Sequence, residues 1–269
     1  MTSANSAALA ASVRPGLRLE GLSMRFGGVR VFEDVSLTVP PAQVTGCIGP
    51  NGAGKTTLIN VICGVYKPVG GRAVLDGQSL EGVKPHQTIE RGLARTFQDV
   101  RIFPFLSARD NVLVAMPAQR GELVRNLGWP RKSLALEERD NRARADALLA
   151  EMALGTVADR PAGELPFGQQ KLIALLRAVA TGAKYLLLDE PAAGVELDML
   201  PRITGIIRRL VKEEGRSALL IEHNVDVVRE VADHVAVLQG GGVIASGTCD
   251  TVLRDPTVIK EYLGRIYNA

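Results

Sequence analysis

The stretch GPNGAGKTT, residues 49–57, constrains the fold of this chain more than any other stretch. It has the spacing G-x-x-x-x-G-K-[ST] and follows QVTGCIG, residues 43–49, an apolar run typical of a buried strand. The residues TTLINVICG after it predict a helix that is closed by Gly64. Such a turn aims backbone N–H groups inward, with the positive end of a helix behind them. The sequence therefore predicts a phosphate-binding turn in an α/β fold, and the strand–turn–helix setting argues against a chance match.

This turn predicts a nucleotide site with a magnesium ion. We expect Lys55 to reach the β- and γ-phosphates and the Thr56 hydroxyl to bind Mg²⁺. The remaining turn residues complete the predicted nucleotide site: Gly49, Pro50, Asn51, Gly52, Ala53, Gly54 and Thr57.

An acidic pair follows a second apolar run, YLLLDE, residues 185–190. Because ligands collect at strand tips in open α/β sheets, Asp189 is predicted to hold Mg²⁺, mostly through water. Glu190 is predicted to orient the attacking water and take its proton. The alternative is that both are ordinary strand-end carboxylates.

The rest of the chain predicts one sheet domain with a helical insertion. LRLEGLSMRF from Leu17 and RVFEDVSLTV from Arg30 alternate as antiparallel strands do, while residues 217–223, SALLIEH, read as a central parallel strand like 185–190. Helical patterns occupy residues 197–214 between the two central strands.

Strand patterns stop in a helical section at about residues 99–165, which we expect to be a subdomain inserted into the domain. Residues 1–15 are expected to be a disordered tail, and residues 16–269 a single domain.

No apolar run approaches the roughly 20 residues that cross a bilayer. A net charge of +3, from 32 basic and 29 acidic residues, gives no reason to expect a nucleic-acid partner.

The order of these motifs resembles that of the nucleotide-binding subunits of ABC transporters, over about residues 16–269. The resemblance implies a P-loop NTPase (RecA-like) sheet core with an antiparallel β subdomain and a helical subdomain, and it implies ATP as the nucleotide. It implies that Phe26 stacks on adenine, although Phe26 could instead be a core residue at a strand edge. Gln98, in ARTFQD, would touch Mg²⁺ and the catalytic water and link the site to a membrane partner. His223, in IEHN, would contact the γ-phosphate.

The stretch LPFGQQ, residues 165–170, resembles the signature loop of this family, which acts on the nucleotide of a second subunit. Gly168 and Gln169 match the family pattern, but Pro166 replaces a serine whose hydroxyl would bind the phosphate. We expect weakened hydrolysis at the partner's site. The alternative is that Pro166 only begins the helix and backbone groups make the contact.

Three stretches resemble the larger ATPase of branched-chain amino acid importers more closely: residues 94–115, 189–194 and 255–264. That resemblance implies an importer ATPase for such amino acids or a related small polar solute. Its partners would be a second ABC ATPase subunit, expected to be a different chain, two transmembrane permeases and a periplasmic solute-binding protein. The chain would then sit on the cytoplasmic face of the inner membrane as a peripheral subunit. A non-transport or lipid-export ABC ATPase is the alternative, and the solute stays open.

Overall fold

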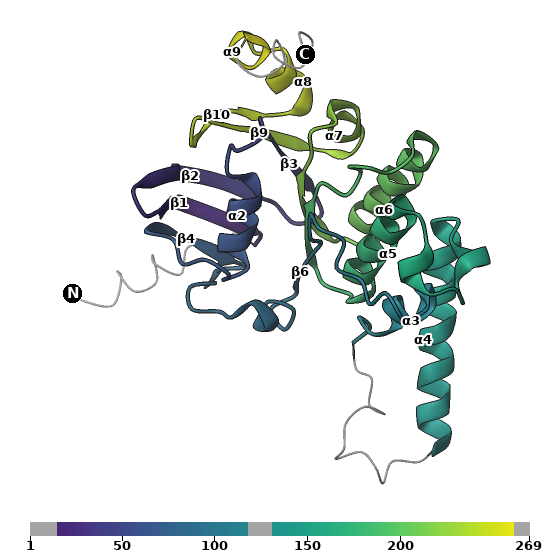
Figure 1. The fold of residues 1–269 in the computed structure, drawn as a ribbon. Helices are drawn as coiled ribbons and strands as arrows, with labels where there is room; N and C mark the ends of the chain where they lie inside the picture. Colours follow the sequence, from purple (N-terminus) through teal and green to yellow (C-terminus); the bar gives the residue numbers. More distant parts are fainter. Residues whose placement is uncertain (1–14, 118–130, 261–269) are drawn as a thin grey trace.

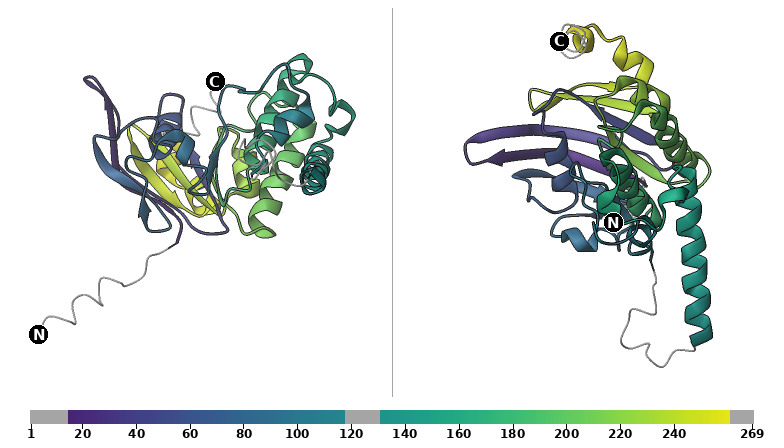
Figure 2. Two further views of the ribbon diagram at one scale, coloured as in Figure 1. Left: turned by 90° about the horizontal axis from the view of Figure 1, so that it is seen from below. Right: turned by 45° about the vertical axis from the view of Figure 1, so that its right-hand side comes forward.

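A computed structural model describes residues 15–117 and 131–260. Residues 1–14, most of the predicted tail, lie outside the described residues. The described chain forms two sheets flanked by helices, with the antiparallel sheet at one side of the molecule and the helical section at the other (Figure 1; Figure 2, left). Within these ranges, no helix is both long and apolar enough to span a membrane.

The smaller sheet is antiparallel and has the strand order β2-β1-β4-β5. Its first two strands form a hairpin in which Leu17 pairs with Val39. This hairpin has an apolar buried side and an exposed side, as the alternating sequence predicts. The strands are β1 (Leu17–Phe26), β2 (Val29–Val39), β4 (Gly70–Leu75) and β5 (Gln78–Ser79).

The larger sheet has six strands in the order β10-β9-β3-β8-β7-β6, parallel except for the antiparallel edge strand β10. Every residue of β3, β7 and β8 is buried, so the prediction of covered central strands is confirmed. The strands are β3 (Val44–Ile48), β6 (Leu93–Arg95), β7 (Tyr185–Asp189), β8 (Ser217–Ile221), β9 (His234–Gln239) and β10 (Gly242–Gly247).

Successive residues of β7 face opposite sides of this sheet. Leu186 and Leu188 belong to a core shared with α5 and α6, whereas Leu187 belongs to a core shared with α2 and the β1–β2 hairpin. The helices of the sheet domain are α2 (Lys55–Ile62), α5 (Phe167–Ala180), α6 (Leu200–Lys212), α7 (Val225–Val231), α8 (Cys249–Leu253) and α9 (Pro256–Val258), with short 3₁₀ turns η1 (Pro85–Gln87) and η6 (Leu197–Met199). The α/β fold is therefore confirmed.

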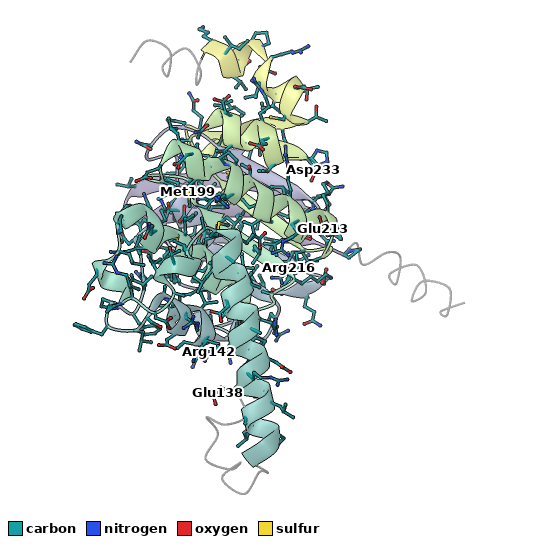
Figure 3. All side chains as sticks on the ribbon, turned by 90° about the vertical axis from the view of Figure 1, so that its right-hand side faces the viewer. Glu138, Arg142, Met199, Glu213, Arg216 and Asp233 are labelled. Atoms are coloured by element: carbon teal, nitrogen blue, oxygen red, sulfur yellow. The ribbon has the colours of Figure 1, made fainter. Side chains whose placement is uncertain are left out.

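The section between β6 and α5 is helical where it is described. It contains α3 (Ala108–Leu113), α4 (Arg131–Glu151), η4 (Gly155–Val157) and η5 (Ala162–Glu164). α4 extends well below the sheet domain, and the side chains of Glu138 and Arg142 lie along its length (Figure 1; Figure 3). Its C-terminal end is anchored because Leu149, Met152 and Leu154 are fully buried in the core shared with α5. The exact boundaries of the inserted subdomain stay a prediction.

Candidate active site

The glycine-rich turn joins β3 to α2 and depends on glycine at two points. A Cβ atom on Gly49 would lie 2.0 Å from the carbonyl oxygen of Leu238 on the neighbouring strand β9. Gly54, the residue before α2, has a φ of 95°, and a Cβ there would lie 2.9 Å from the side chain of Val31. The strand, the turn and the helix therefore pack too closely for side chains at these points, which leaves backbone groups to form the surface.

Lys55 begins α2 and lies back over the turn. Its side chain is largely buried, and Nζ donates hydrogen bonds to the carbonyl oxygens of Gly49 at 2.8 Å and Pro50 at 2.9 Å. Burial lowers the pKa of Lys55, while the nearby Glu190 and Asp189 carboxylates partly oppose this shift. A desolvated cation held over a glycine-rich turn suits the binding of a polyphosphate.

Three oxygen atoms from separate parts of the chain converge beside Lys55. Thr56 Oγ1 lies 3.4 Å from Asp189 Oδ1 and 3.5 Å from Gln98 Oε1. Asp189 is completely buried, its Oδ2 has no hydrogen-bond partner among the described residues, and burial raises its pKa to about 6. Hydroxyl, amide and carboxylate oxygens are the donors that Mg²⁺ takes, so the residues present fit this ion or its bound water.

Glu190 and His223 face each other across the same cavity. His223 Nε2 lies 2.8 Å from Glu190 Oε1. The backbone of Glu190 is in the left-handed region, with a φ of 50°, and its N–H donates to the carbonyl oxygen of Ile221. This bend turns the chain away from the tip of β7.

The cavity beside these side chains has a volume of about 450 Å³, and the buried Asp189 does not line it. Most of its lining comes from the predicted site residues: Asn51, Gly52, Gly54, Lys55, Thr56, Thr57, Gln98, Glu190 and His223. Val31 of β2 also lines it, and no motif marks this ordinary apolar strand residue in the sequence. Of the other turn residues, Gly49 and Pro50 supply the carbonyl groups that bind Lys55, and Ala53 is buried.

The structure does not bring every predicted residue to this cavity. Phe26 ends β1, is 44% exposed and meets Tyr66 edge to face at a centroid distance of 5.0 Å, which argues against the core alternative. Gly168 and Gln169, at the start of α5, are not among the cavity's lining residues. An ideal Cβ on Gly168 would lie 3.5 Å from the carbonyl oxygen of Gly194, so the helix start packs on residues 194–196. The roles of these three residues stay predictions.

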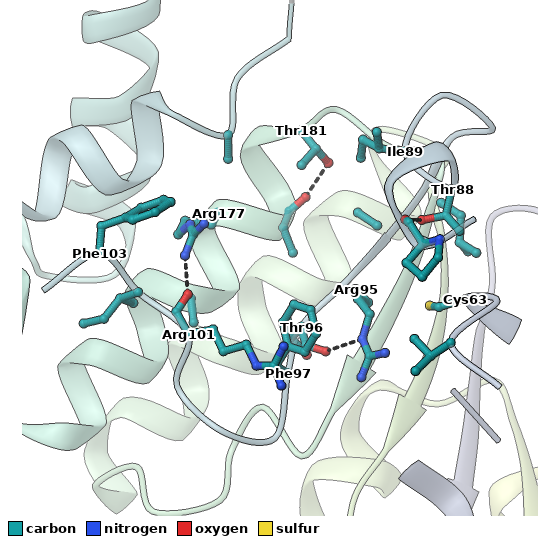
Figure 4. Close-up of a pocket in the computed structure, with 18 residues that line it drawn as sticks. Cys63, Thr88, Ile89, Arg95, Thr96, Phe97, Arg101, Phe103, Arg177 and Thr181 are labelled. Atoms are coloured by element: carbon teal, nitrogen blue, oxygen red, sulfur yellow. Dashed lines mark hydrogen bonds between the residues drawn. The ribbon is translucent and has the colours of Figure 1, made fainter. Parts of the chain in front are cut away.

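A second cavity, of about 590 Å³, lies between the sheet domain and the helical section (Figure 4). We call it the arginine groove, after Arg95, Arg101 and Arg177. The guanidinium groups of Arg95 and Arg101 lie 4.3 and 4.4 Å from the ring centroid of Phe97, and Arg177 stacks on Phe103 at 4.8 Å. Among the described residues, Nε of Arg177 is buried without a hydrogen-bond partner. No sequence motif marks this groove, because residues far apart in the chain line it.

The chain is similar to known proteins over nearly its whole length. A family model described as "ABC transporter" matches residues 32–193. The chain is 38% identical to the high-affinity branched-chain amino acid transport ATP-binding protein BraF of Pseudomonas aeruginosa, over 93% of this chain and 98% of that protein. It is 36% identical to the corresponding protein LivG of Escherichia coli K12, with the same coverage of both chains.

Solved structures agree with these relatives. A nucleotide-free ATP-binding cassette from an ABC transporter has a TM-score of 0.75 and 32% identity, over 92% of this chain and 98% of that one. The ADP conformation of an ATP-binding cassette has a TM-score of 0.76 and 32% identity, over 93% and 98%. The predicted resemblance is thus confirmed, and the chain belongs to the ABC transporter family as an ATP-binding cassette protein.

Proposed function

We propose that this chain is the ATP-hydrolysing subunit of an ABC importer for branched-chain amino acids or a related small polar solute. The observation that carries the proposal is the contact between His223 and Glu190 in the cavity that Lys55 also lines. The names of BraF and LivG support the importer over the non-transport and lipid-export alternatives.

The glycine-rich turn at residues 49–57 and its Lys55 bind ATP in this proposal. The backbone N–H groups of residues 51, 52 and 54–56 would face the phosphates, since Pro50 has no N–H and the Ala53 N–H donates to the Pro50 carbonyl. Lys55 Nζ would exchange its bonds to the carbonyls of Gly49 and Pro50 for bonds to phosphate oxygens. Thr56, Gln98 and Asp189 would hold Mg²⁺, which supplies charge stabilisation at the phosphates when bound. Phe26 would stack on the adenine.

Hydrolysis falls to Glu190 and His223. Glu190 Oε1 accepts a proton from the attacking water, and the ring of His223, 2.8 Å away, keeps that carboxylate aimed into the cavity. Nε2 carries a single N–H, so a hydrogen bond from His223 to the γ-phosphate, as negative charge builds up there, would replace its contact with Glu190. The protein therefore contributes position and charge rather than a covalent intermediate.

The proposed importer contains further subunits. A second ATPase subunit, expected to be a different chain, would pack head to tail so that Gly168 and Gln169 face its nucleotide. One of two transmembrane permeases would dock on the arginine groove, which is apolar and cationic. Residues 95–97 line this groove and run directly into Gln98, which lines the ATP cavity. A periplasmic binding protein would deliver the solute, and this chain would be peripheral on the cytoplasmic face of the inner membrane.

The proposal is tested by expressing the chain with its neighbouring permeases and measuring membrane association and Mg-ATP hydrolysis. We expect both in the parent. Arg101 is exposed in the groove, so Arg101→Glu should replace a positive charge by a negative one where the permease docks. We expect the fraction of this chain bound to the membrane to fall about tenfold. Arg254→Glu, an exposed arginine of the α8 end, is the matched control and should leave the fraction unchanged. A parent that stays off the membrane and binds no Mg-ATP would refute the proposal.

Pro166 gives a separate prediction. It precedes α5 as the N-cap residue, with no side-chain cap, and it is exposed. Pro166→Ser should add a hydroxyl bond to the partner's phosphate and raise ATP turnover of the assembled transporter about tenfold. Serine is also a better helix N-cap, so thermal unfolding must be measured beside turnover. A turnover change of less than about twofold would mean that the hydroxyl is dispensable.

A further inference from the structure

Residues 191–196, which follow Glu190, are held by two buried charged side chains that the mechanism above does not use. These are Lys171 of α5, which is 6% exposed, and Glu222 at the end of β8, which is 2% exposed. We call the pair the buried clamp. Burying a charged side chain costs free energy of folding unless hydrogen bonds satisfy it. The hydrogen-bond partners of these two side chains therefore indicate their role.

Glu222 joins the main chain beside both catalytic residues. Its Oε1 accepts a hydrogen bond of 2.8 Å from the N–H of Ala192, two residues after Glu190. Its Oε2 accepts one of 3.2 Å from the N–H of His223. Because one carboxylate binds both backbones, it fixes the distance between the segments that carry Glu190 and His223.

Lys171 holds the same loop from the other side. Its Nζ donates a hydrogen bond of 2.7 Å to the carbonyl oxygen of Ala193. Burial lowers the pKa of Lys171 and raises the pKa of Glu222, and the attraction between the two charges opposes both shifts. Adjacent backbone groups of the loop, the N–H of residue 192 and the carbonyl of residue 193, thus lie between an anion and a cation.

We propose that Lys171 and Glu222 are positioning residues that hold residues 191–196 so that Glu190 stays within hydrogen-bond reach of His223 and of the attacking water. The inference rests on the proposed function, since it concerns the geometry of hydrolysis. Lys171 lies one turn into the helix that begins at Phe167, so the clamp also ties the start of α5 to the catalytic pair. Neither residue touches the nucleotide cavity, so each acts through Glu190 and His223.

The test compares Glu222→Gln and Lys171→Met with the parent in the assembled ATPase. Gln keeps an acceptor for one N–H group but presents an NH₂ group to the other, and Met keeps the length of Lys without its charge. We expect kcat to fall about tenfold while the KM for ATP changes less than about twofold, because the catalytic base Glu190 moves and the phosphate turn does not. Lys171→Arg, which restores a cationic donor, should recover part of the lost kcat.

A matched control separates this role from support of the fold. Lys212→Met removes an exposed ion pair with Asp233, at 2.7 Å, and should leave kcat unchanged. If Glu222→Gln and Lys171→Met lower the unfolding temperature but keep kcat within about twofold of the parent, the clamp is merely structural. A large rise in KM with unchanged kcat would also overturn the inference. A parent without ATPase activity would instead refute the proposed function.

Discussion

Replacing Glu190 by Gln is expected to slow ATP hydrolysis by at least about a hundredfold while leaving ATP binding intact. The amide has nearly the same shape and keeps an oxygen for the 2.8 Å contact with His223, but it cannot take a proton from water. Nucleotide should therefore remain trapped in a closed dimer. Phosphate release and size-exclusion chromatography with Mg-ATP measure the two effects.

The control for this variant is Glu213→Gln, which removes an exposed carboxylate after α6 (labelled in Figure 3) that does not line the cavity. It should hydrolyse ATP as the parent does. If Glu190→Gln hydrolyses ATP at the parent rate, Glu190 is not the base.

Replacing Lys55 by Met is expected to weaken Mg-ATP binding about ten- to hundredfold, with hydrolysis below detection. Each charge-assisted hydrogen bond from Nζ to a phosphate is worth about 1.5–3 kcal/mol, and the developing charge of the transition state depends on the same group. Because the ammonium group is already desolvated, its loss should change the unfolding temperature little. Equilibrium binding of a fluorescent ATP analogue and calorimetric unfolding test these expectations.

Lys212→Met serves as the control here as well, since it removes a lysine from an exposed ion pair on α6. Should Lys55→Met bind Mg-ATP as tightly as the parent, the turn at residues 49–57 would not be the phosphate site. The whole proposed mechanism would then fail.

Much of the sheet could be predicted because its pattern is local. The apolar runs at residues 185–188 and 218–221 predict strands covered on both faces, and the glycine spacing of residues 49–57 places a turn between a strand and a helix. β6 escaped prediction because Leu93–Arg95 is too short to show a period. It forms because β7 offers it a parallel partner.

The side-chain contacts of the site depend on tertiary structure instead. Lys171 reads as an ordinary helix lysine and Glu222 as a strand-end acid, and only the folded chain brings both to the loop between them. The stacking of Arg95 and Arg101 on Phe97 is likewise invisible in the sequence, since these residues sit among charges that a solvated surface would explain as well.

The position of the Glu190 side chain in the cavity depends on its left-handed backbone conformation. A non-glycine residue in this conformation costs of order 1–3 kcal/mol and persists because its surroundings hold it, here through the bond of its N–H to Ile221. A return of the Glu190 φ angle to a negative value would move its carboxylate away from the position of the attacking water, while every strand stays in place. If Glu190 is the base, a change of backbone conformation one residue beyond β7 would stop hydrolysis while the rest of the fold stays intact.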